Sequence, residues 1–228
     1  MILELRKSEL LAAALPHVAF DGWSQACFEK AIEDLGMDRS IALAIAPGGA
    51  VDLAVAFHEA GDQKMRRDYA NAITDGMKVR AKVTLAVRLR LEAGADKEIV
   101  RRGSSLFALP NHAAQGAKLI WGTADEIWNA LGDTSDDVNW YTKRVILSAV
   151  YASTVLFWLG DDSLNSESTW EFLDRRIENV MHIEVFKSRI KANEPLNAMM
   201  SGPLRILEKL KRPVVRGDLP GGAPKPRV

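Results

Sequence analysis

The stretch DVNWYTKRVILSAVYASTVLFWLG, residues 137–160, decides the fold of this chain. From Val145 to Leu159 it carries no charged side chain, and apolar side chains lie on nearly every side of a helix. A helix that is apolar all round is buried. This run of about fifteen residues is too short to span a bilayer, for which a helix needs roughly 20 residues. The stretch therefore predicts the central helix of an all-α bundle.

Helical spacing of apolar residues also recurs along most of the remaining sequence, whereas long runs that alternate apolar and polar residues are nearly absent. Glycine and proline residues separate the helical segments, for example Gly36 and the PGG sequence at 47–49. We expect about ten helices. They lie at roughly 8–20, 24–36, 38–46, 49–73, 78–93, 96–109, 111–131, 136–159, 166–191 and 195–211.

The composition is that of a soluble globular protein. The chain has 228 residues, of which 47% are apolar and 26% are charged, which is ample for one large core. Thirty basic and thirty acidic residues cancel, and this balance argues against a general nucleic-acid binder. A single cysteine, Cys27, excludes an internal disulfide, and we expect it to be a small buried residue in a reducing compartment. The N-terminal sequence MILELRKSELL lacks the pattern of a presequence, so we expect a cytoplasmic protein.

The first sixty residues have the outline of a helix-turn-helix, with three short helices joined by tight turns. Their layout resembles the N-terminal domain of tetracycline-repressor-type regulators. A DNA-reading helix needs polar and basic side chains, yet the segment from Met37 to Phe57 carries one basic residue, Arg39, beside Asp38 and Asp52. We therefore expect residues 1–60 to form a degenerate head that does not bind nucleic acid. A ligand-responsive transcription regulator is the alternative.

Residues 61–192 are expected to form a helical bundle that also mediates dimerisation. Its central helix carries both small residues and bulky neighbours, and this composition permits either tight helix packing, including a dimer seam, or an apolar cavity for a lipid. The candidate cavity residues lie in the helices at 111–131 and 136–159. They are Leu119, Ile120, Ser148, Ala152 and Leu156.

The sequence shows no set of residues that argues for catalysis. None of the four histidines belongs to a metal-binding pair such as H-E-x-x-H, and Cys27 has no evident histidine partner. The PGG sequence lacks the strand and the Lys-Ser/Thr of a phosphate-binding loop. We expect no catalytic residue, no metal and no cofactor, and hence a protein that is not an enzyme.

Residues 195–212 have one apolar stripe with basic residues mostly away from it. This pattern is typical of a helix that lies on a membrane surface, although the stripe could equally pack on this bundle or on a partner. The tail at 213–228 is rich in proline and glycine, and we expect it to be disordered. The stripe consists of Leu196, Met199, Met200, Leu204, Leu207 and Leu210.

Residues 108–181 resemble the core of the ubiquinone (coenzyme Q) biosynthesis protein nine family. The similarity is carried by GD-S-D-NWYT-R, which begins at Gly132, and by TW-FL-RRI, which begins at Thr169. LPHVAFDGWS at 15–24 and RLRLEA at 88–93 also fit the family.

The resemblance implies a tetracycline-repressor-like, all-α homodimer that binds lipids, including isoprenoid quinone intermediates, instead of DNA. It also implies an accessory role without enzymatic activity, in which the protein delivers a polyprenylated substrate from the membrane to a ring hydroxylase. The family's C-terminal amphipathic helix binds membrane, and this strengthens the same expectation for residues 195–212. We expect a bacterial protein on the inner face of the cell membrane, where a phospholipid could occupy the cavity instead. An enzyme that acts on the quinone precursor itself is a further alternative.

The resemblance also implies a patch that docks the hydroxylase. Helical geometry allows one of the adjacent rings of Trp140 and Tyr141 to turn inward while the other turns toward the surface. An exposed aromatic side chain beside an arginine is typical of an interface. The alternative is that Trp140 packs on a neighbouring helix and Tyr141 caps it. The predicted patch consists of Asp137, Trp140, Tyr141 and Arg144, with Ile127 and Trp128 one helix earlier.

Overall fold

The computed structural model describes the backbone of residues 2–94 and 96–191, and the side chains of residues 3–94 and 96–179. These residues form nine α-helices and one short 3₁₀ turn, η1 (Leu164–Ser166), and no strand occurs among them. The all-α prediction is confirmed. The helices are α1 (Ile2–Asp21), α2 (Gln25–Asp34), α3 (Arg39–Ile45), α4 (Ala50–Ala70), α5 (Val79–Glu92), α6 (Lys97–Ala108), α7 (Ala113–Ala130), α8 (Val138–Leu159) and α9 (Glu167–Lys191).

Most of the predicted helices agree with the structure to within a few residues. The first helix begins at Ile2, whereas the prediction placed its start at residue 8. The prediction missed the first turns because they expose Leu3 and Leu5 and so have no buried apolar stripe. The predicted helix at 195–211 and the predicted tail at 213–228 lie outside the described residues.

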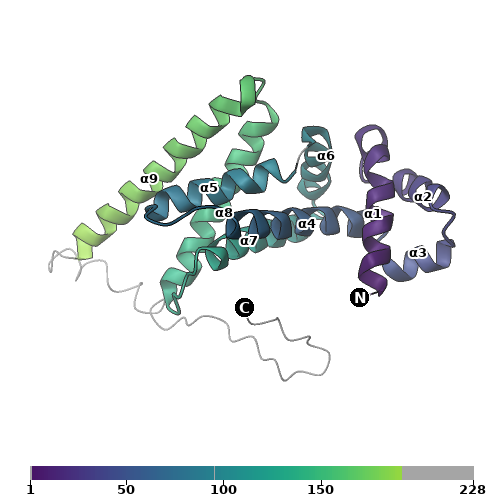
Figure 1. Ribbon diagram of the computed structural model, residues 1–228, viewed down its shortest axis with the longest axis horizontal. Helices are drawn as coiled ribbons and strands as arrows, with labels where there is room; N and C mark the ends of the chain where they lie inside the picture. The colour runs from purple at the N-terminus through teal and green to yellow at the C-terminus, as the bar shows by residue number, and fades with distance from the viewer. Residues whose placement is uncertain (1, 95, 192–228) are drawn as a thin grey trace.

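Helices α1, α2 and α3 form a head at one end of the molecule (Figure 1). The side chains of Ser24 and Asp38 cap α2 and α3 by accepting hydrogen bonds from backbone N–H groups. Cys27 is buried in the head, as predicted, and its thiol donates to the carbonyl oxygen of Ala14 at 3.5 Å. Burial, reinforced by the nearby charge of Asp21, raises the pKa of this thiol to about 11.

Helix α4 joins the head to the rest of the bundle and packs against both (Figure 1). It begins directly after Gly49, whose φ of +59° lies in the region that favours glycine. This finding explains the PGG break in physical terms. Because α4 continues past residue 60, the head and the bundle share one helix and are not separated by a linker.

Helices α4, α5, α7, α8 and α9 form the body around a second core that includes Val87, Ala124 and Leu147. Helix α8 packs between α7 and α9. The prediction that this helix is buried on all sides is wrong, because the side chains of Val145 and Leu156 are 56% and 67% exposed. Its apolar composition therefore reflects one buried face and one apolar face that is open in a single chain.

Within the described residues, no single helix has the length and apolar character needed to cross a membrane. Helices α3 and α4, which meet at an angle of 48°, satisfy that criterion of length and composition only when they are taken together.

Candidate functional site

A cavity of about 390 Å³ lies where the head meets the body. Helices α4, α6, α7 and α8 supply most of its wall, Trp23 of the α1–α2 turn contributes from the head, and Arg90 contributes from α5. Most of the lining is apolar. Its described members are Trp23, Ala54, Phe57, His58, Arg90, Ile99, Val100, Gly103, Ser104, Phe107, Ala108, Ala113, Gly116, Ala117, Leu119, Ile120, Tyr151, Ala152, Val155 and Leu156.

Four of the five predicted cavity residues, Leu119, Ile120, Ala152 and Leu156, line this space. Ser148 does not line it, and its Oγ is buried without a hydrogen-bond partner among the described residues. The composition of α7 and α8 pointed to these five residues, and their role in binding a lipid stays a prediction. The prediction missed the contribution of α6, although Ile99, Gly103 and Phe107 are spaced four residues apart and share a helix face.

Small residues let the walls approach closely. A Cβ atom at Gly116 would lie 2.8 Å from the Cβ of Phe107, so α6 and α7 can meet here only if position 116 lacks a side chain. Ala54 and Ala152 likewise leave room where larger apolar residues would fill the cavity. The space therefore depends on small residues from several helices.

The wall of the cavity also holds one polar cluster, which we define as His58, Asp62, Arg90, Thr123 and Tyr151. Arg90 Nε donates to Asp62 Oδ1 at 2.5 Å, and Arg90 Nη2 donates to the carbonyl oxygen of His58 at 2.9 Å. Thr123 Oγ1 donates to Asp62 Oδ1 at 2.8 Å and lies 2.8 Å from His58 Nε2. The guanidinium of Arg90 lies 5.7 Å from the centre of the Tyr151 ring.

Burial sets the protonation of this polar cluster. It lowers the pKa of His58 to about 4, and the positive charge of Arg90 adds to the effect. His58 is therefore neutral near pH 7. Burial also raises the pKa of Tyr151, so its hydroxyl keeps its proton. Burial acts to lower the pKa of Arg90, but Tyr151 and Asp62 outweigh this effect, and the net pKa is raised.

Gly61 makes room for this arrangement. A Cβ atom at position 61 would lie 2.6 Å from Arg90 Nη1, so a side chain there would displace the guanidinium from α4. Sequence reasoning missed Asp62 and Arg90, because a charged residue on a helix ordinarily indicates a solvent-exposed face. Their pairing brings together residues that are 28 positions apart in the sequence.

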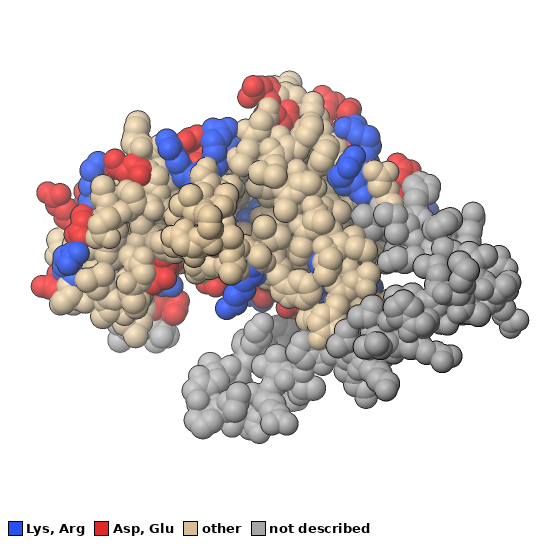
Figure 2. Space-filling model, turned by 180° about the vertical axis from the view of Figure 1, so that it is seen from behind, with Lys and Arg blue, Asp and Glu red and all other residues tan. Residues whose placement is uncertain are grey.

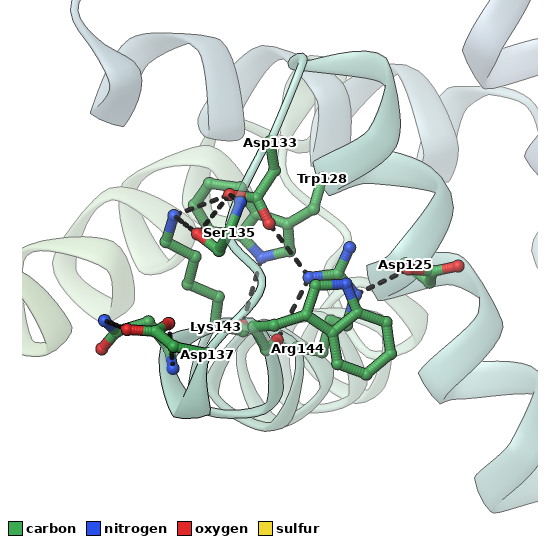
Figure 3. A network of polar contacts seen from close by, with 9 residues as sticks. Asp125, Trp128, Asp133, Ser135, Asp137, Lys143 and Arg144 are labelled. Carbon is green, nitrogen blue, oxygen red and sulfur yellow. Dashed lines mark hydrogen bonds and ion pairs between the residues drawn. The ribbon is translucent and has the colours of Figure 1, made fainter. Parts of the chain in front are cut away.

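A second polar network surrounds Arg144 at the start of α8 (Figure 3). Arg144 Nε donates to Asp125 Oδ1 at 2.6 Å, and Arg144 Nη1 donates to Asp133 Oδ2 at 3.1 Å. Lys143 Nζ donates to Asp133 Oδ1 at 2.7 Å. Burial acts to raise the pKa of Asp133, but the hydrogen bonds from Lys143, Ser135 and Arg144 outweigh it and lower that pKa to about 2.

This network corrects the predicted docking patch. Arg144 and Ile127 are fully buried and Trp140 is 7% exposed, so the expectation of an exposed patch is wrong for these three side chains. Arg144 lies in the interior because Asp125 and Asp133 neutralise it there, whereas the sequence suggested a surface cation. The alternative prediction, that Trp140 packs on a neighbouring helix, is confirmed, since the centre of its ring lies 5.9 Å from that of Trp121 of α7.

The other three patch residues are accessible. Asp137 is exposed and caps α8 by accepting from the backbone N–H of Asn139 at 2.9 Å. Tyr141 and Trp128 are half-buried. The Tyr141 ring packs edge-on against Trp140 at 4.8 Å, and Trp128 Nε1 donates to the carbonyl oxygen of Lys143 at 3.1 Å. The role of these residues in docking stays a prediction.

A second cavity, of about 410 Å³, lies beside this network. Its lining includes Leu147 and Ile177 together with the cations Arg80, Lys82 and Lys143. Across the part of the chain that the structure describes, no group of three histidine, cysteine, aspartate or glutamate residues is placed to hold a metal ion.

The segment that contains α7, α8 and most of α9 also has recognisable relatives. Residues 113–184 match the COQ9 family. The predicted resemblance is thereby confirmed. The chain is 29% identical over 194 residues to the "Probable ubiquinone biosynthesis protein coq9, mitochondrial" of Dictyostelium discoideum, an alignment that covers 81% of this chain and 62% of the relative.

Animal COQ9 proteins show similar relationships. The chain is 26% identical over 197 residues to "Ubiquinone biosynthesis protein COQ9, mitochondrial" of Homo sapiens, covering 83% of this chain and 62% of the human protein. It is 30% identical over 189 residues to the Drosophila melanogaster protein, covering 80% of this chain and 57% of that protein. The chain thus spans about three fifths of the length of the COQ9 relatives that it matches.

The fold itself is that of a tetracycline-repressor-like protein. The TetR transcriptional regulator from Nitrosomonas europaea superimposes with a TM-score of 0.63, covering 76% of this chain and 96% of the regulator, at 16% sequence identity. The predicted fold class is confirmed. The COQ9 relatives are named as mitochondrial proteins, and the comparisons therefore do not support the bacterial cytoplasmic setting that the sequence led us to expect.

Proposed function

We propose that this chain is a lipid-binding accessory protein of ubiquinone biosynthesis. It holds an isoprenoid quinone intermediate in the cavity between head and body and presents it to a ring hydroxylase at a membrane surface. The observation that carries the proposal is the cavity of about 390 Å³, whose wall is mostly apolar. This volume falls within the range of small-molecule sites, roughly 300–1,000 Å³. The match to COQ9, whose relatives are named for ubiquinone biosynthesis, supports the pathway.

The head supports a role other than DNA reading. Arg39 is the one basic residue of α3, and its Nε donates to Glu29 Oε1 at 3.0 Å. Ile41, on the same helix, is exposed. A helix that reads base edges needs free donors and acceptors, which α3 does not offer. A transcription regulator, which the likeness to TetR alone would suggest, is therefore the less supported function.

The open face of α8 supports a homodimer. Val145 and Leu156 lie exposed on this helix, and the ring of Phe157 stacks on that of Phe172 of α9 at 4.4 Å. The middle of one face of the molecule is dominated by uncharged residues, while charged residues gather around it (Figure 2). Exposed apolar area of this kind is typical of a protein interface.

The hydroxylase and the membrane enter as proposed partners. Asp137, Tyr141 and Trp128 are the accessible members of the predicted patch and form the proposed docking contact. The apolar stripe from Leu196 to Leu210, outside the described residues, is the proposed membrane contact. The chain delivers its ligand, and the hydroxylase supplies the chemistry.

Ligand titration with a cavity-blocking variant tests the proposal. Decylubiquinone should quench the tryptophan fluorescence of the wild type, because Trp23 lines the cavity. Ala152→Phe fills the cavity and should weaken binding at least tenfold, whereas the control Ala60→Phe, at an exposed position of α4, should bind like the wild type. Equal affinity in Ala152→Phe and the wild type would show that the ligand does not occupy this cavity.

A further inference from the structure

The polar cluster is the part of the cavity that has no role in holding an apolar chain. His58, Arg90 and Tyr151 line the space themselves, while Asp62 holds Arg90 and Thr123 holds His58 through hydrogen bonds. A cavity that holds only hydrocarbon does not need polar residues in its wall, and burying them lowers the stability of the protein unless they are hydrogen-bonded. The polar cluster thus marks the end of the cavity that a polar part of a ligand would occupy.

The charge of the polar cluster limits the ligand. Arg90 is the one charged side chain among the described cavity-lining residues, and Asp62 lies against it in an ion pair whose two side chains are buried. His58 and Tyr151 are neutral near pH 7, for the reasons given above. The polar cluster therefore carries no net charge. A phosphate or carboxylate entering it would lose its water and gain no free counter-charge.

The hydrogen-bonding groups that face the cavity fit oxygen atoms on a ring. A guanidinium has five N–H donors, and the contacts of Arg90 with Asp62 and His58 employ its Nε and Nη2 atoms, which leaves further N–H donors for a ligand. The Tyr151 hydroxyl both donates and accepts. If Thr123 gives its proton to Asp62, His58 Nε2 carries the hydrogen that points at Thr123, and its other ring nitrogen is an acceptor.

We propose that the polar cluster is a head-group subsite, which binds an uncharged aromatic or quinonoid ring bearing hydroxyl or carbonyl oxygens and disfavours anionic lipid head groups. Arg90 and Tyr151 donate to the ring oxygens, and His58 accepts from a ring hydroxyl. The hydrocarbon chain of the ligand runs along the apolar wall formed by residues such as Ile120 and Val155. This inference rests on the proposed function, and it selects a ring over a phospholipid as the ligand.

Three probes with the same decyl chain separate the alternatives. Decylubiquinone carries a neutral oxygenated ring, decyl phosphate carries an anionic head, and decylbenzene carries a ring without oxygen. The wild type should bind decylubiquinone about tenfold more tightly than either of the other two, as measured by fluorescence titration. Tyr151→Phe and His58→Leu should each weaken decylubiquinone binding by about three- to tenfold, which is the effect of one lost hydrogen bond, and should leave decylbenzene binding unchanged.

Tyr69→Phe is the matched control, because Tyr69 is also buried but does not line the cavity. This variant should bind all three probes as the wild type does, and a thermal melt of each variant checks that it is folded. Tyr151→Phe keeps the buried ring, so the test stands even if His58→Leu fails to fold.

The outcomes are distinct. Tighter binding of decyl phosphate, or equal binding of decylbenzene and decylubiquinone, would overturn the subsite while leaving a lipid-binding cavity. An equal loss for all three probes in Tyr151→Phe would assign that hydroxyl a structural role and would also overturn it. If the wild type binds none of the three probes, the proposed function fails and the subsite fails with it.

Discussion

Replacing Trp140 by alanine should destabilise the protein strongly, although the sequence predicted that Trp140 belongs to a docking patch. The Trp140 side chain is 7% exposed and packs against the rings of Trp121 at 5.9 Å and Tyr141 at 4.8 Å. The guanidinium of the buried Arg144 lies 4.0 Å above its ring. Truncation of a buried tryptophan to alanine costs about 3–5 kcal/mol, because the apolar contacts are lost and a cavity remains.

The expected change in melting temperature follows from this cost. For a chain of this size, each kcal/mol shifts the melting temperature by roughly 2–4 °C, so the variant should melt about 6–20 °C below the wild type. Urea unfolding monitored by circular dichroism gives the free energy directly. Phe20→Ala, which truncates an aromatic ring of the head that is 86% exposed, is the matched control and should change the free energy of unfolding by about 0.5 kcal/mol or less. A Trp140→Ala protein whose free energy of unfolding lies within about 1 kcal/mol of the wild type would show that Trp140 is not part of the core.

Two further predictions concern buried ionisable side chains. Arg144→Met should lower the free energy of unfolding by about 3–5 kcal/mol. The buried side chain of Asp133 would keep its contacts with Lys143 and Ser135 but lose its ion pair with Arg144. A loss below about 1 kcal/mol, measured by urea unfolding, would contradict this prediction. His58 should make the protein less stable in acid. Its pKa is about 4 in the folded chain and near 6.5 in the unfolded chain. As the pH falls from 6.5 to 4, the unfolded chain therefore binds a proton that the folded chain does not, and the free energy of unfolding falls. This linkage amounts to at most about 3 kcal/mol at pH 4, and it should be absent in His58→Leu, so the stability difference between the two proteins should change between pH 7 and pH 4.5. A difference that is constant over that range would show that His58 does not titrate with a lowered pKa.

Local signals in the sequence were sufficient for most of the fold. The PGG sequence predicted the break before α4, and the structure shows why, since Gly49 adopts a positive φ. The apolar run of α8 predicted a core helix but could not show which of its faces is covered. Hydropathy measures composition, whereas burial depends on which helices pack against a given face. Val145 and Leu156 are as apolar as their buried neighbours and yet lie exposed.

The cavity was predictable only in part, for a related reason. The small and bulky residues of α7 and α8 pointed to Leu119 and Ala152, because the composition of a single helix can be read from the sequence. The polar cluster combines residues from α4, α5, α7 and α8. The spacing of four residues within α4 connects only His58 and Asp62, and no spacing within a single helix connects this pair to Arg90, Thr123 or Tyr151. Arg90 and Asp62 each resemble surface charges until the fold places them together.

The predicted docking motif and the cavity are mechanically connected through α8. Arg144, Tyr151 and Trp158 are buried and lie seven residues apart, which is about two helical turns, so they share one face of this helix. The Arg144 network fixes the beginning of that face, and Tyr151 of the polar cluster lies further along it. A substitution at Trp140 that loosens the helix would therefore also displace Tyr151. Loss of hydroxylase binding in such a variant supports a docking contact only if the variant still binds decylubiquinone with the affinity of the wild type.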